Sequence, residues 1–238
     1  MTKFSLLSFD VFRTLLDIEE HKDRPEAFTL LARFLAYHGV VTDPKSLHQS
    51  ITDLTDASLA ANPSPTPDVD ILDILASALG PQTDFSLLSQ AALLLRAATT
   101  RLSPVPGAQA AVAQLAPQFP LAICSNTQRA YTIGELRAFG FLPHFGTIVF
   151  SSDVLACKPD PAMFHRLSAL TGTDPAQIIH IGDNLVDDII AAKSFGCTTI
   201  WVDRHHDAAR PDLDHQAADA IIGPDLTDLP RIIAQFLT

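Results

Sequence analysis

The feature that most constrains the fold is a short, mostly apolar run that recurs along the chain and is followed each time by polar residues. The runs are Phe4–Phe9, Leu121–Cys124, Gly146–Phe150, Ile178–Ile181 and Thr198–Val202. Such runs are typical of parallel strands that are buried on both faces. The helical patterns that separate them cover Ala108–Ala116, Ala130–Phe139, Pro161–Leu170 and Asp187–Phe195. This alternation predicts an α/β fold, in which helices cover both faces of a doubly wound parallel sheet.

The stretch from Ile18 to Leu102 interrupts the alternation. Its patterns are helical, with no strand, over Pro25–His38, Pro44–Ala60, Val69–Leu79 and Phe85–Leu102. The segment Asn62–Pro67 has a proline at every second position and is expected to be a stiff, extended loop. We therefore expect an all-helical cap domain at residues 18–102, inserted into a core of residues 1–17 and 103–238. The expected hinges lie near Asp17–Arg24 and Leu102–Gly107.

Composition limits the classes of partner. The 238 residues carry 27 Asp and Glu against 16 Lys and Arg, which gives a formal net charge of -11. Because phosphate backbones and anionic membranes need a basic face, neither a nucleic acid nor a membrane is an expected partner. A small anionic metabolite would have to be attracted by a local site. For the assembly, we expect a monomer or a homodimer.

The cysteines and the amino terminus indicate the compartment. Cys124, Cys157 and Cys197 are far apart and have no metal-ligand spacing, which is typical of reduced thiols. The first residues lack the features of a signal peptide, and no apolar run reaches the roughly 18 residues of a membrane span. These observations favour a cytoplasmic protein. His205 and His206 have no partner at ligand spacing, so a loop is the simpler interpretation.

In open parallel sheets, ligands bind just outside the carboxyl ends of the strands. This rule predicts one crevice formed by residues far apart in sequence, namely Asp10, Ser125, Asn126, Asp153 and Asp183. Taken alone, an acidic residue such as Asp10 could be a nucleophile, a metal ligand or a turn residue. Ser125 and Asn126 could hold an anionic oxygen or cap the following helix.

Two further segments carry charge. Lys158 lies in the sequence Lys-Pro-Asp-Pro before a helix, where a lysine is usually exposed. The segment Gly182–Asp188 holds three carboxylates, those of Asp183, Asp187 and Asp188, at a strand end. Like charges so close together are costly, and Mg²⁺, which prefers hard oxygen ligands, would relieve the repulsion. A solvated helix N-terminus is the alternative, because it also favours acidic residues.

The order and spacing of these residues resemble the motifs of the haloacid dehalogenase (HAD) superfamily of hydrolases. The motifs are Asp10 with Thr14, then Ser125, then Lys158, and finally Asp183 with Asp188. The resemblance covers nearly the whole chain and includes the position of the helical cap between the first two motifs. It implies a HAD-like, Rossmann-type core and hydrolysis through a covalent aspartyl-enzyme intermediate.

The resemblance also implies a role for each motif residue. Asp10 would be the nucleophile that forms the aspartyl intermediate. Thr14 and Ser125 would orient and stabilise oxygens of the transferred group, and Lys158 would neutralise charge shared by Asp10 and the substrate. The implied ligands of Mg²⁺ are Asp10, the main-chain carbonyl of Phe12, Asp183 and, directly or through water, Asp188.

The chain departs from the phosphatase pattern at Phe12, where most phosphatases of the superfamily carry a second Asp as general acid and base. Phenylalanine cannot transfer a proton, so a rate enhancement of about 10²–10⁴-fold from acid–base catalysis is missing or supplied elsewhere. The 2-haloacid dehalogenases are similar to this chain at three positions: they carry an aromatic residue at the position of Phe12, and their pattern matches Asn184 and Asp187. Their leaving halide needs no proton. Those enzymes use no Mg²⁺ and lack the acid equivalent to Asp183. A buried acid beside Asp10 is costly without a metal, so Asp183 favours Mg²⁺-dependent hydrolysis of a small phosphorylated metabolite.

Two alternatives stay open: a metal-independent dehalogenase of 2-halo acids, and a catalytically weak member that binds a ligand or a partner. The residues expected to line the substrate site are Phe12, Arg13, Asn126 and Asn184. Arg13 is unusual for the superfamily at its position. Its guanidinium could clamp a substrate carboxylate or phosphate, or it could pair with Glu19 or Glu20 near the hinge.

Overall fold

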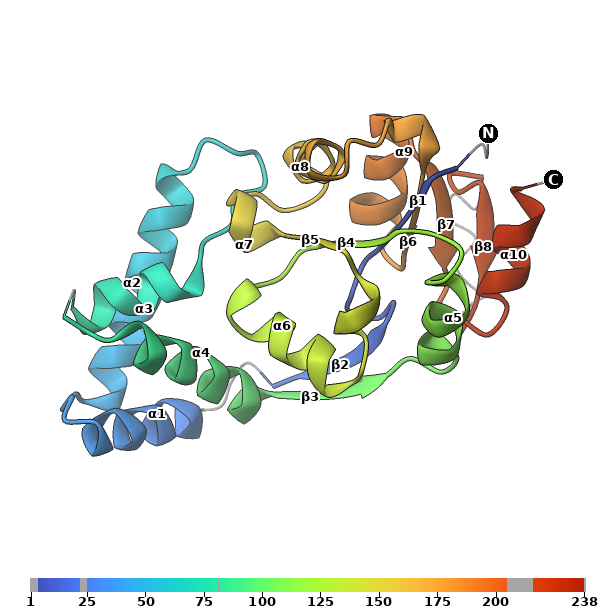
Figure 1. The fold of residues 1–238 in the computed structure, drawn as a ribbon. Helices are drawn as coiled ribbons and strands as arrows, with labels where there is room; N and C mark the ends of the chain where they lie inside the picture. Colours follow the sequence, from blue (N-terminus) through green and yellow to red (C-terminus); the bar gives the residue numbers. More distant parts are fainter. Residues whose placement is uncertain (1–3, 22–24, 81, 205–215, 238) are drawn as a thin grey trace.

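The computed structural model describes residues 4–21, 25–80, 82–204 and 216–237. Arg24, at one predicted hinge, and the pair His205-His206 lie outside the described residues. The chain forms an open sheet with flanking helices and, to one side of it, a group of four helices (Figure 1). Within the described residues, no helix is long and apolar enough to cross a membrane.

The open sheet has six strands, and every neighbouring pair runs parallel. In chain order the strands are β1 (Leu6–Phe9), β4 (Leu121–Ser125), β5 (Thr147–Phe150), β6 (Ile178–Gly182), β7 (Thr198–Val202) and β8 (Ala220–Ile222). The spatial order β5-β4-β1-β6-β7-β8 places β1 between β4 and β6. The predicted α/β fold is confirmed, and β8 is an additional edge strand that the hydropathy pattern did not predict.

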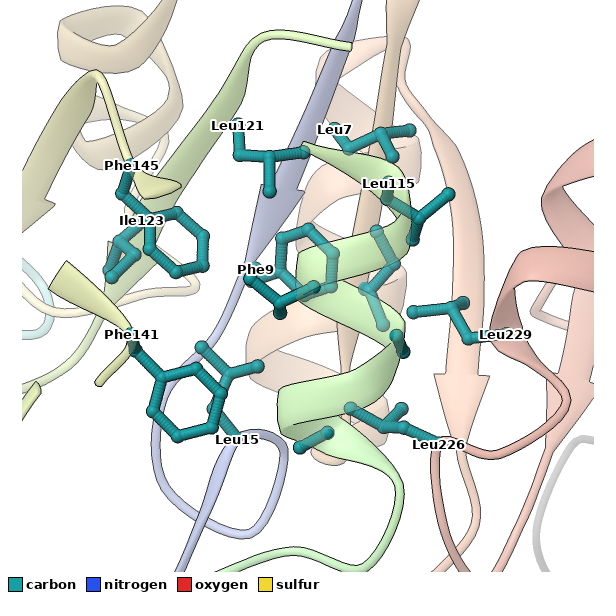
Figure 2. Close-up of a cluster of buried hydrophobic side chains, with 14 of the residues drawn as sticks. Leu7, Phe9, Leu15, Leu115, Leu121, Ile123, Phe141, Phe145, Leu226 and Leu229 are labelled. Atoms are coloured by element: carbon teal, nitrogen blue, oxygen red, sulfur yellow. The ribbon is translucent and has the colours of Figure 1, made fainter. Parts of the chain in front are cut away.

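Successive residues of each strand point to opposite faces, and each face has its own core. Leu7 and Phe9 of β1 belong to the core shown in Figure 2, whereas Leu6 belongs to the core on the other face. The helices on the first face are α5 (Ala108–Leu115), α6 (Arg129–Ala138) and α10 (Leu229–Gln235). Those on the second face are α8 (Ala162–Thr171) and α9 (Ala191–Phe195). Shorter helical turns lie at α7 (Ser151–Val154), Leu142–His144 and Pro175–Gln177.

The remaining helices form a second body, which we call the helical unit (Pro25–Thr99). Its helices are α1 (Pro25–Tyr37), α2 (Pro44–Ala61), α3 (Ile71–Leu79) and α4 (Phe85–Thr99). Asp43, Asp70 and Asp84 each accept an N–H from the first turn of the helix that follows, which explains where α2, α3 and α4 begin. Buried apolar side chains, including those of Leu35 and Leu75, form a separate core between these helices.

Two short strands join the helical unit to the open sheet. β2 (Leu16–Glu20) and β3 (Thr100–Pro104) pair antiparallel, with Glu20 opposite Thr100. The expectation of a segment without strands is therefore wrong, and α4 ends at Thr99, earlier than predicted. Each strand is short and only partly buried, so its pattern is weak in the sequence, and its stability depends on a partner far along the chain. The domain boundaries predicted at 17/18 and 102/103 fall inside these strands.

Candidate active site

The strand order brings the first and last motifs together. The main-chain N–H of Asp10 donates to the carbonyl oxygen of Ile181 at 2.9 Å, which continues the β1–β6 ladder beyond β1. Ser125 ends β4 on the other side of β1. Asp10, Ser125 and Asp183 therefore line one cavity, together with Lys158. The crevice predicted from the strand ends is present for these residues.

Lys158 lies at the centre of a buried charge network. Its side chain is 2% exposed, and its Nζ donates to Asp10 Oδ1 at 2.9 Å and to the Cys124 carbonyl at 2.8 Å. A third bond goes to Asp188 Oδ1. Burial acts to lower the pKa of Lys158, but the Asp10 and Asp188 carboxylates outweigh burial and raise that pKa. The lysine therefore stays protonated, and it is not the exposed residue that its local sequence usually indicates.

The three carboxylates around this lysine titrate differently. Burial raises the pKa of Asp10 to about 6, although the Lys158 charge acts to lower it. Burial, and then the charges of Asp10 and Asp188, raise the pKa of Asp183 to about 8. Burial also acts to raise the pKa of Asp188, but Lys158 and His180 hold it well below its usual range. The shortage of positive charge is therefore greatest at Asp183.

The segment after β6 folds Asp188 back beneath the strand end. Asn184 accepts two N–H groups of the turn that follows it and so begins a π-helix, Leu185–Ile190. The main-chain N–H of Asn184 donates to Asp188 Oδ2 at 3.0 Å. A Cβ at position 182 would overlap the Asp188 carboxyl group, so this close packing requires Gly182. Asn184, predicted to line the substrate site, does line the cavity and is also this structural cap.

Three acids could hold a metal ion. Asp10, Asp183 and Asp188 each offer a carboxylate oxygen, and these oxygens lie within 4.8 Å of one another. Both oxygens of Asp188 already accept hydrogen bonds, from Lys158 and from the Asn184 N–H, which suits a supporting role. Asp187, which was not among the predicted metal ligands, is partly buried and also lines the cavity. The pair of adjacent carboxylates, Asp187 and Asp188, was the sequence signal that could have placed Asp187 in the cavity wall.

Asn126 joins the loop after β4 to the loop that carries Lys158. Its Nδ2 donates to the Lys158 carbonyl at 3.0 Å, and its Oδ1 accepts the Lys158 N–H at 2.7 Å. The alternative of a helix cap is not found, because Gln128 occupies the N-cap position of α6. Asn126 does line the cavity, so contact with substrate stays a prediction. Its bonds to the lysine main chain had no signal in the sequence, since the partners are 32 positions apart.

Two adjacent cavities meet at this site. The cavity around Asp10 has a volume of about 170 Å³, which is small for a whole ligand, since ligand pockets usually hold about 300–1,000 Å³. A second cavity of about 390 Å³ shares Phe12, Arg13 and Asn126 with the first. The helical unit contributes Asp68 and Arg96 to the wall of this second cavity. The second cavity is thus bounded by both bodies of the molecule.

Arg13 faces both cavities without a fixed partner. Its side chain is exposed, its φ is +60°, and it makes no ion pair within the described residues. Glu19 Oε1 lies 2.9 Å from His21 Nε2, and Glu20 Oε1 lies 3.0 Å from Arg96 Nη1. The alternative in which Arg13 pairs with Glu19 or Glu20 is therefore not found. A non-glycine residue at positive φ costs free energy and is typical of functional loops. The alternative in which Arg13 clamps a substrate anion stays a prediction.

Phe12 packs against Arg96, a residue that no sequence motif singled out. The guanidinium carbon of Arg96, from α4, lies 4.9 Å from the centroid of the Phe12 ring and 4.7 Å from that of Tyr131. The same guanidinium lies 2.8 Å from Glu135 on α6 and 3.0 Å from Glu20 on β2. Arg96 therefore links the helical unit to the nucleophile loop and to the core.

Two predicted residues lie away from the cavity around Asp10. Thr14 is fully buried, its hydroxyl has no hydrogen-bond partner among the described residues, and its role toward the transferred group stays a prediction.

The strand-end rule wrongly predicted that Asp153 lines the crevice. It pairs with Arg129 at 2.5 Å and accepts the Phe150 N–H at 3.0 Å, because α7 begins directly after β5 and turns Asp153 back onto the helix start.

His180 is a buried polar residue behind the site that sequence reasoning missed. Its ring lies on β6, with Nδ1 3.1 Å from Ser8 Oγ and Nε2 3.4 Å from Asp188 Oδ1. Burial lowers the pKa of His180, which favours the neutral ring. A histidine inside an otherwise apolar strand run was the available signal. The ring connects Asp188 to the interior of the sheet.

Comparison with known proteins identifies the family. The sequence profile of the haloacid dehalogenase-like hydrolases matches residues 78–202, which is more than half of the chain. The chain belongs to this family, as its motifs predicted.

Individual relatives cover less of the molecule. The chain is 38% identical over 74 residues to haloacid dehalogenase-like hydrolase domain-containing protein 3 of Danio rerio, covering 31% of this chain and 30% of the relative. It is 29% identical over 103 residues to a phosphoserine phosphatase of Thermus thermophilus, and this match covers 43% of this chain and 40% of the relative. The matches span less than half the length of either relative. A 2-haloacid dehalogenase from Pseudomonas syringae pv. Tomato DC3000 has the same fold, with a TM-score of 0.68, 22% identity and coverage of 98% of this chain and 99% of that one.

Proposed function

We propose that this protein is a Mg²⁺-dependent phosphohydrolase that acts on a small phosphorylated metabolite through an aspartyl-enzyme intermediate. The observation that carries the proposal is the cluster of Asp10, Asp183 and Asp188, with ligand oxygens within 4.8 Å of one another. Without a cation, Asp183 adds negative charge to a buried nucleophile, which is unfavourable. A divalent ion gives this residue a function.

The donor set fits Mg²⁺. Carboxylate oxygens are the hard ligands that this ion prefers. Burial, and then the charges of Asp10 and Asp188, raise the pKa of Asp183 to about 8, so its ionised carboxylate lacks a compensating cation. Asp10 and Asp183 would hold the ion, with the Phe12 carbonyl and Asp188 in the roles that the family resemblance implies. When bound, the ion would neutralise charge on the phosphoryl group.

Lys158 and Ser125 prepare Asp10 for attack. The Lys158 ammonium holds Asp10 Oδ1, which fixes the rotation of the carboxyl group and leaves the second oxygen as the nucleophile. As that oxygen bonds to phosphorus, the bond from phosphorus to the ester oxygen breaks and its electron pair remains on the departing alkoxide. Ser125, in the cavity wall, can donate to a phosphoryl oxygen. Water then attacks phosphorus, which releases phosphate and restores Asp10.

Phe12 determines which esters react well. Because its side chain cannot donate a proton, the departing alkoxide takes its proton from solvent. Esters of acidic alcohols, such as aryl phosphates, should therefore react faster than alkyl phosphates. The cavity of about 170 Å³ would take the phosphoryl group, and the neighbouring cavity of about 390 Å³ would take the rest of the metabolite.

The test is release of phosphate from an aryl phosphate, measured with Mg²⁺ and with EDTA. We expect turnover that requires Mg²⁺ and that Asp10→Asn abolishes, because the amide is not a nucleophile. Turnover that survives EDTA, or that survives in Asp10→Asn, would contradict the proposal.

Phe12 also favours a second candidate, the hydrolytic removal of halide from a 2-halo acid. In that reaction an Asp10 oxygen bonds to the carbon that bears the halogen, and the halide leaves with the electron pair and needs no proton. Halide release from a 2-halo acid in EDTA, lost in Asp10→Asn, would establish this function in place of the first.

A further inference from the structure

The proline-rich segment of the helical unit is bonded to the loop that carries Lys158. We call Asn62–Asp68 the strap and Leu155–Asp160 the lysine loop. The Thr66 hydroxyl donates to the Cys157 carbonyl at 2.6 Å, and the Thr66 carbonyl accepts the Cys157 N–H at 2.7 Å. The Ser64 hydroxyl donates to Asp160 Oδ2 at 2.6 Å. These bonds lie on both sides of Lys158 along the chain.

Further bonds hold the start of the lysine loop. Asn62 Nδ2 donates to the Leu155 carbonyl at 2.6 Å, and the Asp68 N–H donates to the same oxygen at 3.1 Å. Leu155 has a φ of +57°, a left-handed conformation that is unfavourable for a residue with a side chain. The lysine loop contains no helix or extended strand of its own. Its conformation therefore depends on bonds from outside, which come from the strap and from Asn126.

The residues that directly follow the strap are bonded to the loop after Ser125. Gln128 Nε2 donates to the Val69 carbonyl at 2.8 Å, and Gln128 Oε1 accepts the Ile71 N–H at 2.9 Å. Asn126, in the same loop, is bonded to the main chain of Lys158. One segment of the helical unit is thus connected to both core loops that place side chains around Asp10.

We propose that Thr66 and Ser64 are positioning residues for Lys158, and that docking of the strap sets the alignment of the lysine with Asp10. The helical unit then contributes to the reaction as well as to the cavity wall. The kinetic part of this inference rests on the proposed function. Alternating prolines suit the role, because a segment that prolines restrict loses little further conformational freedom when it docks.

The experiment compares Thr66→Val, which removes the hydroxyl, with Thr66→Ser, which keeps it. The matched control is Thr52→Val, because the Thr52 hydroxyl bonds only within its own helix, to the His48 carbonyl, and is exposed. Hydrogen exchange of the Cys157 and Lys158 amides is measured by mass spectrometry, alongside kcat and KM for an aryl phosphate with Mg²⁺. Ser64→Ala provides a second, independent removal of one strap bond.

We expect Thr66→Val to speed exchange of these amides and to lower kcat, each by about fivefold, the factor that corresponds to a hydrogen bond of about 1 kcal/mol. KM should stay within about twofold, because Thr66 lines neither of the two cavities that would take the substrate. Thr66→Ser and Thr52→Val should resemble the wild type, and Ser64→Ala should lower kcat in the same direction as Thr66→Val.

Unchanged exchange in both Thr66→Val and Ser64→Ala would overturn the inference, because the strap would not hold the loop. Faster exchange with unchanged kcat would overturn it as well, because the loop would not align the lysine. If the wild type releases no phosphate, the proposed function fails by itself. The exchange measurement then still decides whether the strap holds the lysine loop.

Discussion

The core of the helical unit and the carboxyl edge of the sheet are built from opposite kinds of interaction. Between α1, α2, α3 and α4, the buried side chains of the core are apolar. At the sheet edge, Asp10, Lys158, His180 and Asp188 are buried in one connected network. Removing apolar atoms from a packed core lowers the free energy of unfolding in proportion to the number of atoms removed. A buried charge, in contrast, is stable only while its partners remain. The helical core should therefore weaken by degrees, and the site should fail as a unit.

The largest effect is expected from Lys158→Met. The substitution leaves Asp10 and Asp188 buried and uncompensated, so the free energy of unfolding should fall by about 3–5 kcal/mol, and hydrolysis should be lost. Urea unfolding measures the first effect. Lys193→Met is the control, because its pair with Asp219 is well exposed and should contribute less than about 1 kcal/mol. Equal losses in the two variants would remove the distinction between the regions.

Leu75→Ala tests the other side of the comparison. Leu75 is fully buried in the helical core, so the free energy of unfolding should fall by about 2–4 kcal/mol. The kcat of the folded enzyme should stay the same, because the cavity created lies in a different core from the site. A large fall in kcat at a temperature where the variant is folded would show that the helical core shapes the reaction directly.

Phe12→Asp would extend the charged network by one acid. If the scaffold is that of a phosphatase, the new carboxyl can protonate the leaving group, and turnover of alkyl phosphates should rise by up to about 10²-fold. Aryl phosphates should gain less, because their leaving groups need less help. Initial rates on a matched alkyl and aryl pair measure the difference. No gain on either ester would count against the phosphatase proposal.

The last prediction concerns the pH dependence of stability. Because the pKa of Asp183 is raised from 3.8 to about 8, the folded protein keeps a proton there that the unfolded chain loses. The free energy of unfolding of the metal-free protein should therefore fall as the pH rises through this range. Asp183→Asn should flatten that slope, and Mg²⁺ at about pH 8 should stabilise the wild type more than the variant. Unfolding curves at several pH values, with and without Mg²⁺, provide the check.

The sequence was most informative where the signal is local or follows a rule of topology. The apolar runs predicted five of the six strands of the open sheet. The strand-end rule then placed Asp10, Ser125 and Asp183 together. Asp153 shows the limit of that rule, since it follows a strand yet bonds to Arg129 and leaves the crevice.

What could not be predicted depends on partners far along the chain. The pairing of β2 with β3, the contact of Arg96 with Phe12 and the bonds of Asn126 to Lys158 each join distant segments through ordinary residue types. Hydropathy and motif spacing contain no record of such contacts. The proline pattern predicted an extended segment, but the strap bends at residues 64–66, and the pattern did not indicate the loop to which it binds.

The antiparallel pairing of β2 with β3 has a consequence for how such a chain can be altered. Glu20 and Thr100 face each other across the ribbon, so the chain leaves and re-enters the core at one place. For the sheet, everything between these two residues is equivalent to the loop of a hairpin. Loops of this kind can be exchanged for others of different length at little entropic cost. A different body grafted at these two points would leave the nucleophile and the β2–β3 ribbon in place, but it would have to supply the bonds that the strap makes to the lysine loop. Substrate choice would then be a modular property of the polypeptide.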